Sequence, residues 1–230
     1  MTTVRLFSAR ACPFAHRTRL VLAEKGEAFE LREIDLQNKP QDFAAVSAYG
    51  KVPAIEHAGH HLYESAIINE YLDEVFPKPP LLPADAGRRA LARIWIDYAN
   101  TRFVQAFGGL LRAESAAEES GARSALDESL EFIEREALGK LSGDGPFWLG
   151  SAVTLVDFTF YPWFERLPAL RHYRGYAPSK HLARLEAWRQ AVSRLPSVTG
   201  QQSSVEYYIE RYARFARPAK PQAASHENAR

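Results

Sequence analysis

The residue of this sequence best suited to covalent chemistry is Cys12, the only cysteine among 230 residues. It follows a short apolar stretch, and Pro13 follows it at the expected first position of a helix. Proline fits there because its missing N–H needs no partner and its backbone angle is already helical. A thiol at a helix N-terminus lies near unpaired N–H groups that favour the thiolate. The pattern predicts a nucleophilic or redox-active cysteine; the alternative is a small buried apolar residue.

Two further pairs of residues in the first third of the chain could bind a ligand beside Cys12. Val52 and Pro53 open an expected strand, where proline is tolerated at the first residue, and Glu64 and Ser65 open an expected helix. Helix N-termini attract anions, and strand backbone hydrogen-bonds extended peptides. Gathered at one edge of a sheet, these positions would form a site for a small acidic peptide thiol.

The elements that must position these residues are predicted by the spacing of apolar side chains. Residues 4–76 alternate short strands and helices in the order β-α-β-α-β-β-α, which indicates an α/β domain with a mixed sheet. The expected strands are 4–7, 29–36, 52–56 and 62–63, and the expected helices are 13–26, 41–48 and 65–75.

A proline-rich linker over 77–85 separates this domain from the rest of the chain. The long stretches after it all favour helices, namely 86–113, 120–141, 154–166, 181–194 and 205–215, with Gly108 and Gly109 expected to interrupt the first. Thr154 and Asp157 have the spacing of a helix capping box, with a structural role. We divide the chain into an α/β domain at 1–76, the linker at 77–85, an all-α domain at 86–216 and a tail at 217–230 whose composition favours disorder.

The composition excludes several classes of function. The formal net charge is +1 and the basic residues are spread along the chain, so no nucleic-acid partner is expected. One cysteine excludes an intrachain disulfide and a multi-cysteine metal site, and we expect no metal. The apolar stretch 147–164 contains Asp157 and is shorter than the roughly 20 residues of a membrane span, so we interpret it as a buried helix. The N-terminus lacks the pattern of a secretion signal, which favours the cytoplasm.

A series of short motifs, in order and spacing, resembles the cytosolic glutathione transferases over about residues 4–200. The chain is most similar to the omega and omega-like classes, which carry a cysteine. The resemblance implies a thioredoxin-like N-terminal domain, an all-α C-terminal domain and, as is common in the family, a homodimer. The motifs are Cys12-Pro13-Phe14-Ala15, Arg17-Thr18-Arg19-Leu20-Val21-Leu22, Asn38-Lys39-Pro40, Val52-Pro53, Tyr63-Glu64-Ser65-Ala66-Ile67, Glu70-Tyr71-Leu72-Asp73-Glu74 and Pro162-Trp163-Phe164-Glu165-Arg166-Leu167.

The resemblance also implies glutathione as the co-substrate. The backbone of Val52 would pair with the cysteinyl part of glutathione, next to a cis peptide bond at Pro53. Glu64 would meet the ammonium of the γ-glutamyl end, while the hydroxyl of Ser65 and the helix N-terminus would meet its carboxylate. The alternative for Ser65 is an ordinary helix cap.

Four side chains near these positions have further expected roles. By resemblance, Lys39 would meet the glycyl carboxylate of glutathione and Phe14 would pack beside the thiol; the alternatives are a surface lysine and a core phenylalanine. His16, one helical turn after Cys12, departs from the acidic residue of the omega pattern. We expect it in solvent, although a protonated imidazole there could raise the thiolate fraction. Ser8 is the fallback hydroxyl should Cys12 prove inert.

The cysteine decides the type of chemistry. Conjugating transferases stabilise the glutathione thiolate with a hydroxyl, whereas a cysteine can attack sulfur and form a mixed disulfide. Ala15 stands where dithiol glutaredoxins carry a second cysteine, so the mechanism must be monothiol. We predict a glutathione-dependent thiol transferase or reductase that acts on glutathione mixed disulfides, dehydroascorbate or S-glutathionyl adducts. The alternatives are glutathione conjugation or reductive dehalogenation of a xenobiotic, and a non-catalytic binding protein similar to the RNA-polymerase-associated stringent starvation protein.

The second substrate, a small electrophile or disulfide, is expected between the two domains. Trp163 and Arg166 belong to the matching motif of the all-α domain and could line its pocket. Tyr98, Arg102 and Tyr207 are further candidates from their positions alone.

Overall fold

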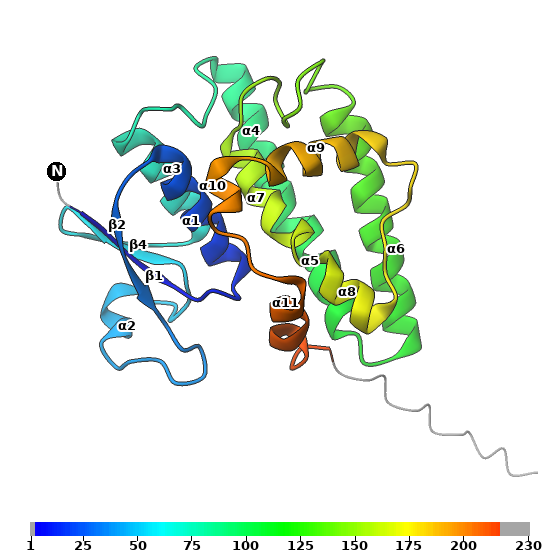
Figure 1. Cartoon of the computed structure of the whole chain (residues 1–230), viewed down its shortest axis with the longest axis horizontal. Helices are drawn as coiled ribbons and strands as arrows, with labels where there is room; N and C mark the ends of the chain where they lie inside the picture. Colours follow the sequence, from blue (N-terminus) through cyan, green and yellow to red (C-terminus); the bar gives the residue numbers. More distant parts are fainter. Residues whose placement is uncertain (1–2, 217–230) are drawn as a thin grey trace, which may run out of the picture.

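The computed structural model describes residues 3–216, so the expected disorder of the tail concerns residues that lie outside the described range. A four-stranded sheet forms one side of the molecule and helices form the other, with α1 and α3 between them (Figure 1). The elements of residues 4–75 follow the order β1, α1, β2, α2, β3, β4, α3, which confirms the predicted order.

The sheet is mixed, as predicted, with strand order β2-β1-β3-β4. β1 (Val4–Ser8) is parallel to β2 (Phe29–Glu33), and α1 (Pro13–Lys25) makes the crossover between them. β3 (Ala54–His57) runs antiparallel to both β1 and β4 (His60–Tyr63). A parallel pair needs such a crossover, whereas the antiparallel pair β3–β4 is joined by a tight turn.

The two faces of the sheet have separate apolar contacts because side chains alternate along a strand. Leu6 lies opposite Ile55 in the register, and both are buried in the cluster that includes α1 and α3 (Ser65–Val75). The next pair, Phe7 and Ala54, is buried on the other face with the short helix α2 (Phe43–Val46). The sheet is therefore covered on both faces, and the loops at its edge are held in place.

Helices form most of the rest of the described chain. Two helices that begin at or next to a proline were not predicted, α8 (Leu167–Arg174) and α10 (Pro196–Thr199). The predicted helices correspond to α4 (Ala86–Tyr98) with α5 (Val104–Arg112), α6 (Ala116–Phe132), α7 (Leu155–Phe164), α9 (Ala183–Ser193) and α11 (Val205–Tyr212).

The first long helix is interrupted at a different place from the one predicted. A π-helical turn, Ala99–Phe103, joins α4 to α5, while Gly108 and Gly109 both lie inside α5. A Cβ atom at Gly109 would lie 3.5 Å from the Cβ of Ala122 on α6. That distance is an ordinary van der Waals contact, so α6 packs beside this glycine, and the glycine does not end a helix.

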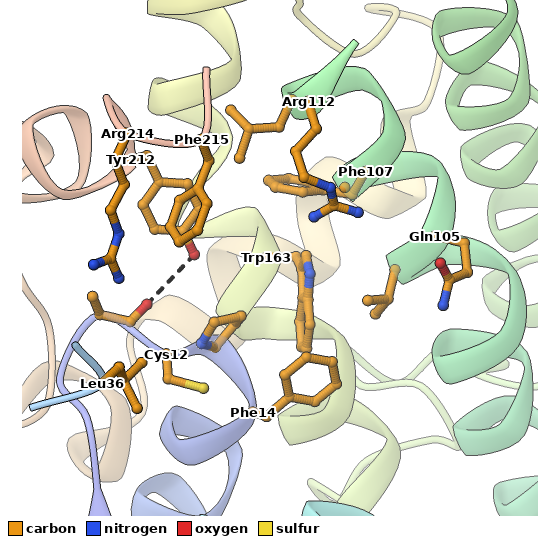
Figure 2. A pocket seen from close by; sticks show the side chains of 15 residues that line it. Cys12, Phe14, Leu36, Gln105, Phe107, Arg112, Trp163, Tyr212, Arg214 and Phe215 are labelled. Atoms are coloured by element: carbon orange, nitrogen blue, oxygen red, sulfur yellow. Dashed lines mark hydrogen bonds between the residues drawn. The ribbon is translucent and has the colours of Figure 1, made fainter. Parts of the chain in front are cut away.

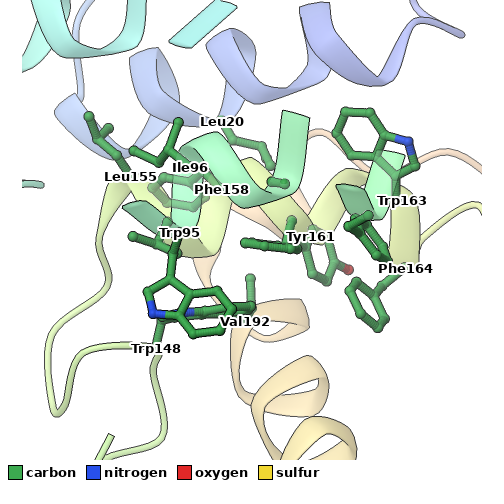
Figure 3. Close-up of a cluster of buried hydrophobic side chains, with 14 of the residues drawn as sticks. Leu20, Trp95, Ile96, Trp148, Leu155, Phe158, Tyr161, Trp163, Phe164 and Val192 are labelled. Atoms are coloured by element: carbon green, nitrogen blue, oxygen red, sulfur yellow. The ribbon is translucent and has the colours of Figure 1, made fainter. Parts of the chain in front are cut away.

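α7 is the centre of the helical core, and all of its ten residues are buried (Figure 3). Trp148 stacks on Phe160 with ring centroids 4.2 Å apart. The predicted buried helix over 147–164 is wrong for residues 147–154, which form turns and an isolated bridge between Phe147 and Gly150. Those residues instead present backbone N–H groups to the start of α7.

The capping role predicted for Asp157 is confirmed. Its buried carboxylate accepts hydrogen bonds from the backbone N–H and the hydroxyl of Thr154, at 2.7 and 2.8 Å. It also accepts from the N–H of Trp148 at 2.9 Å and from the indole of Trp188 at 2.7 Å. Burial raises the pKa of Asp157, and these four donors act against that rise.

Within residues 3–216, no helix combines the length and the apolar character that a membrane crossing requires.

Candidate functional site

Cys12 lies where β1 ends and α1 begins. It is the N-cap residue of α1 with an extended backbone, and Pro13 occupies the first helical position, as predicted. Cys12 is half-buried as a residue, and its Sγ lies 3.7 Å from the backbone oxygen of Val52, to which the S–H donates. The peptide bond between Val52 and Pro53 is cis, as the resemblance implied. The tertiary fold thus brings the strand backbone of residue 52 directly to the cysteine.

A small pocket of about 120 Å³ opens beside this contact. Five residues proposed from the sequence line it together, and three others, Tyr49, Lys51 and Tyr63, were missed; the full lining is Phe14, Tyr49, Lys51, Val52, Pro53, Tyr63, Glu64 and Ser65. Tyr49 and Tyr63 pack edge to face with ring centroids 4.8 Å apart, which closes one wall. Only their turn and strand-end positions in the sequence could have suggested them.

Lys39 does not line this small pocket. It is exposed, and its Nζ lies 4.0 Å from where a Cβ atom of Gly50 would stand. Gly50 has a φ of 58°, a left-handed conformation that glycine adopts without strain, and it leads the chain into Lys51. Both lysines therefore lie at the same side of the pocket, and the expected role of Lys39 stays a prediction.

The N-terminus of α3 forms the far end of the small pocket. Glu64 is its N-cap residue with a φ of 72°, a conformation that non-glycine residues rarely adopt. Such strain costs on the order of 1–3 kcal/mol and is found most often at binding and catalytic sites. Ser65 follows as the first helical residue and is buried. The unpaired N–H groups of this helix end and the serine hydroxyl suit a carboxylate.

A buried arginine that sequence reasoning missed lies directly beneath this helix end. Arg17 donates to the hydroxyl of Ser65 at 3.2 Å, to the amide oxygen of Asn100 at 2.7 Å and to the backbone oxygen of Thr159 at 2.9 Å. Its guanidinium lies 5.0 Å from the ring centroid of Phe14 and 4.4 Å from that of Trp163. Burial lowers the pKa of Arg17 to about 9. One of its nitrogens, Nη2, has no hydrogen-bond partner in the described part of the chain.

The polar residues 16–19 are all buried, which explains why they were not recognised. Polar side chains on a helix normally mark its solvent face. Here α1 is covered by the sheet on one side and by α7 on the other, so no face of its first half is left for water. Arg17 and Arg19 are therefore buried in the first half of α1, where their polarity would predict exposure.

The expectation that His16 lies in solvent is wrong. The imidazole is fully buried, and its Nδ1 accepts a hydrogen bond from Arg166 at 3.2 Å. Because a guanidinium only donates, the ring proton is on Nε2. Burial, followed by the charges of Arg166 and Arg19, lowers the pKa of His16 well below its ordinary 6.5. A neutral imidazole at neutral pH does not stabilise the thiolate of Cys12.

Arg166 fixes the loop that carries the cysteine. Its Nε and Nη2 donate to the backbone oxygen of Ala11 at 3.3 and 3.2 Å, and its Nη1 donates to the backbone oxygen of Pro162 at 2.7 Å. The hydroxyl of Tyr212 donates to the same oxygen of Ala11 at 3.4 Å. Arg166, expected to line a substrate pocket, is instead a buried brace between α7 and the residue before Cys12.

The electrostatic surroundings of Cys12 act in two directions. Burial is the larger effect and raises the pKa of the thiol above its ordinary value. The backbone N–H groups of Ala15 and Phe14 and the charges of Arg166 and Arg19 lower it. The helix end thus acts in the direction that the sequence predicted, but burial outweighs it in the ligand-free protein.

A second, larger cavity of about 370 Å³ lies between the α/β domain and the helices of the all-α domain, with Cys12 on its floor (Figure 2). Phe14 belongs to both cavities, and its ring meets that of Trp163 edge to face at 5.0 Å. The lining comes from four parts of the chain: Ala11, Cys12, Pro13, Phe14 and Leu36; Val104, Gln105, Phe107, Gly108, Leu111 and Arg112; Trp163; and Tyr212, Arg214 and Phe215.

Of the five candidates for the second substrate, only Trp163 lines this larger cavity. Tyr98 and Arg102 line a separate depression on α4, α5 and α6, because their side of the helix faces away from Cys12. Tyr207 lines a depression with Arg10 and Arg211 on the outer side of α11. The structure therefore does not bring these residues together with Cys12.

Two further expectations concern neighbouring groups. Ser8, the fallback hydroxyl, is buried and accepts a hydrogen bond from Arg19 at 2.6 Å, so it does not face either cavity. Among residues 3–216 there is no group of three or more histidine, cysteine, aspartate or glutamate side chains arranged to hold a metal ion.

Comparisons with known proteins agree with this geometry. Residues 11–75 match the family model described as "Glutathione S-transferase, N-terminal domain", and residues 88–194 match "Glutathione S-transferase, C-terminal domain". Glutathione S-transferase omega-1 of Sus scrofa is 34% identical over 197 residues, which cover 85% of this chain and 79% of that protein.

Solved structures are also similar. Glutathione transferase Omega 3C from Trametes versicolor has a TM-score of 0.81 and 31% identity, covering 92% of this chain and 89% of that one. Rice GST1, solved in complex with glutathione, has a TM-score of 0.82 and 31% identity, covering 92% of this chain and 95% of that one.

Proposed function

The chain belongs to the glutathione S-transferase family, in which it is omega-like, and from that premise we propose that this enzyme moves or reduces glutathionyl groups through a mixed disulfide on Cys12. The observation that carries the proposal is that Cys12 lines the larger cavity while its sulfur contacts the backbone of Val52, which lines the small pocket. From there the sulfur would reach both the thiol part of a peptide in the small pocket and a second molecule in the larger cavity.

Glutathione would occupy the small pocket in an extended form. The backbone of Val52 would pair with its cysteinyl residue, which brings its sulfur to Cys12. The γ-glutamyl carboxylate would meet Ser65 and the N-terminus of α3, above the buried charge of Arg17, while Glu64 would hold the ammonium. Either Lys39 or Lys51 would meet the glycyl carboxylate, since both lie at that side.

The reaction would have two disulfide exchanges. The Cys12 thiolate attacks the glutathionyl sulfur of an oxidised substrate, forms a Cys12–glutathione disulfide and releases the substrate as its thiolate, which takes up a proton. A second glutathione, as thiolate, attacks the glutathionyl sulfur of that disulfide. Glutathione disulfide leaves and Cys12 regains its thiol. In sum, one free glutathione enters, the substrate leaves as a free thiol, and the glutathionyl group that the substrate carried leaves within glutathione disulfide.

Intact-mass measurement after incubation with glutathione disulfide tests the proposal. One glutathione adduct per chain is expected for the wild type and none for Cys12→Ser. Because burial raises the pKa of Cys12, adduct formation should speed up as the pH rises through the alkaline range. A wild-type chain that stays unmodified across that range would contradict the mechanism.

A paired assay separates this proposal from conjugation and reductive dehalogenation. Reduction of hydroxyethyl disulfide should exceed conjugation of a chlorinated aromatic compound, and Cys12→Ala should abolish the reduction. The non-catalytic alternative would require recovery of RNA polymerase in a pull-down together with no retention on immobilised glutathione.

The assembly and the location of the enzyme remain proposals. We propose a homodimer, as is common in the family, and light scattering of the purified chain is the direct test: a monomeric mass would contradict it. A cytoplasmic location is proposed from the sequence, and no nucleic-acid or membrane partner is proposed.

A further inference from the structure

Arg17 is a fully buried cation, and no carboxylate within residues 3–216 forms an ion pair with it. Other buried cations of the protein do have such a partner. Lys25 pairs with Asp73 at 2.5 Å, and Arg174 pairs with Glu119 at 3.3 Å. The lack of a partner sets Arg17 apart from them.

The two buried arginines closest to Arg17 in role, Arg19 and Arg166, differ from it in the same respect. The charge of Glu33 favours the charged form of Arg19, and that of Glu165 favours the charged form of Arg166. For Arg17, burial lowers the pKa to about 9, and among the described residues only the cysteine acts in the opposite direction. The protein thus holds one buried positive charge uncompensated, which is unfavourable unless an anion from outside pairs with it.

Three elements hold this guanidinium in place. Its Nε donates to the backbone oxygen of Thr159 on α7 at 2.9 Å, and its Nη1 donates to the amide oxygen of Asn100 at 2.7 Å. Asn100 belongs to the π-helical turn between α4 and α5, and such turns are frequent at functional sites. The same Nη1 donates to the hydroxyl of Ser65 at 3.2 Å, at the N-terminus of α3. The positive charge is therefore fixed at the wall of the small pocket.

The contact with Arg17 determines what the hydroxyl of Ser65 can do. Because a guanidinium only donates, the serine oxygen is the acceptor and its own proton stays available. No residue of the described chain accepts a hydrogen bond from this hydroxyl. The buried Nη2 of Arg17 has no acceptor there either. One buried contact beside the small pocket thus contains two donors without acceptors, which suits a carboxylate that enters this pocket.

We propose that Arg17 is a positioning residue for glutathione: it directs the hydroxyl proton of Ser65 toward the γ-glutamyl carboxylate and supplies the positive charge that this carboxylate neutralises. A charge-assisted hydrogen bond is about twice as strong as a neutral one. A ligand without the carboxylate leaves the buried charge uncompensated and therefore binds weakly. The assignment rests on the proposed function in one respect, namely that glutathione occupies the small pocket.

A matched pair of peptides measures this role. Glutathione and 4-aminobutanoyl-cysteinyl-glycine both carry the amine and the thiol, but the second peptide lacks the γ-glutamyl carboxylate. Isothermal titration calorimetry on Cys12→Ser gives both affinities without disulfide chemistry. Glutathione should bind about 10–100-fold more tightly, as expected for a hydrogen bond that involves charged groups. A ratio of affinities near one would overturn the proposal.

Arg17→Met, made in the Cys12→Ser chain, replaces the charge by an apolar side chain of similar length. It should reduce the ratio of the two affinities by about tenfold. Thr18→Val is the matched control, because Thr18 also ties α1 to α3, through Asn69 at 2.9 Å, yet does not line the small pocket. It should keep the ratio. An unchanged ratio in Arg17→Met, or an equal loss in Thr18→Val, would contradict the role of Arg17.

A second variant keeps the test valid if Arg17→Met does not fold. Asn100→Asp is isosteric and gives the guanidinium a carboxylate partner inside the protein. Because the buried charge is then neutralised without a ligand, the ratio should again fall by about tenfold. Thr101→Asp adds the same charge at the next residue, which is exposed, and should leave the ratio unchanged. Equal ratios in these two variants would overturn the proposal.

These binding measurements do not depend on the chemistry of Cys12. If glutathione binds more tightly than its analogue but the wild type gains no adduct from glutathione disulfide, the mixed-disulfide mechanism fails and the role of Arg17 stands. If the adduct forms but the two peptides bind equally, the role of Arg17 fails and the mechanism stands.

Discussion

The small pocket and the larger cavity meet at Phe14 but are built in different ways. The small pocket takes all of its lining from residues 14–65 and depends on backbone features, a cis peptide bond at Pro53, a left-handed Glu64 and the end of α3. The larger cavity takes its lining from residues between 11 and 215 and depends on side chains. Backbone geometry depends little on individual side chains, so the small pocket suits one fixed ligand. The ligand of the larger cavity can change when one of its lining side chains is substituted.

Charge is also distributed differently between the two. In the small pocket, the lining includes Glu64 beside Lys51 and a helix end, so it offers partners to both ends of a zwitterionic peptide. In the larger cavity, the lining includes arginines and no carboxylate. The difference suggests that the first selects a molecule by its pattern of charges and the second by shape, apolar surface and a single sign of charge.

The largest effect is expected on stability, because α7, which carries Trp163 of the larger cavity, is held by the cap at Asp157. Asp157→Ala would leave the buried N–H groups of Trp148, Thr154 and Trp188 without their acceptor. We expect the free energy of unfolding to fall by about 3–5 kcal/mol and Tm by about 10 °C. Thermal unfolding followed by circular dichroism measures both.

Asp144→Ala is the matched control for that variant, since Asp144 is exposed, and it should stay within about 0.5 kcal/mol of wild type. Equal stability of the two variants would show that α7 and its Trp163 wall do not depend on this cap.

The next effect should separate the two cavities. Ser65→Ala removes a hydroxyl from the small pocket, and a hydrogen bond to a charged group contributes about 1.5–3 kcal/mol. KM for glutathione should therefore rise by about 10–100-fold, while KM for hydroxyethyl disulfide should change by less than about twofold, since Ser65 does not line the larger cavity. Ser129→Ala, another buried serine, should leave KM for glutathione unchanged. A parallel rise in KM for both substrates would mean that the cavities act as one site.

The pH dependence of stability should report on the contact between His16 of α1 and Arg166 at the end of α7. His16 is held neutral in the folded protein, with its pKa well below 6.5, whereas in the unfolded chain it titrates at its ordinary value. Below about pH 6.5 the unfolded state binds the extra proton, so stability falls as the pH falls. Between pH 7.5 and 5.5 this loss of stability is on the order of 1 kcal/mol.

His16→Asn offers Arg166 an acceptor that does not titrate, and denaturant unfolding at the two pH values should show a smaller loss on acidification than in wild type. The control His172→Asn, at an exposed histidine, should keep the wild-type loss. A slope unchanged in His16→Asn would contradict the assignment of a neutral buried imidazole.

The smallest effect concerns residues placed outside both cavities. Tyr98→Phe and Arg102→Gln should change KM for hydroxyethyl disulfide by less than about twofold, because these side chains line a depression on another side of the helices. Steady-state kinetics of the reduction measures this. A large rise in KM for either variant would extend the larger cavity beyond its described lining.

The two cavities also differ in how far the sequence predicted them. Six residues were proposed for glutathione from motifs, and all but Lys39 line the small pocket, namely Phe14, Val52, Pro53, Glu64 and Ser65. The elements that hold them follow each other closely along the chain, so their order and spacing define the arrangement.

The larger cavity was predicted only at Trp163. Its other walls come from helices whose rotation about their own axes is set by packing. The π-helical turn between α4 and α5 also changes which side of the helix each residue of α5 faces. The burial of His16 was misjudged for a related reason: a polar side chain indicates solvent until a second layer of structure covers it. Arg166 was expected at the substrate pocket and is buried beside it instead.

The sequence by itself determined the order of strands and helices, the single cysteine at a helix start and the family to which the chain belongs. Apolar periodicity and turn residues are local properties, so they can be recognised without the fold. Only the tertiary structure decided that burial raises the pKa of Cys12, that Arg17 lies beneath Ser65, and that Arg112 and Arg214 share one cavity. Each of these depends on which distant segments exclude water from a group, and that is a property of packing.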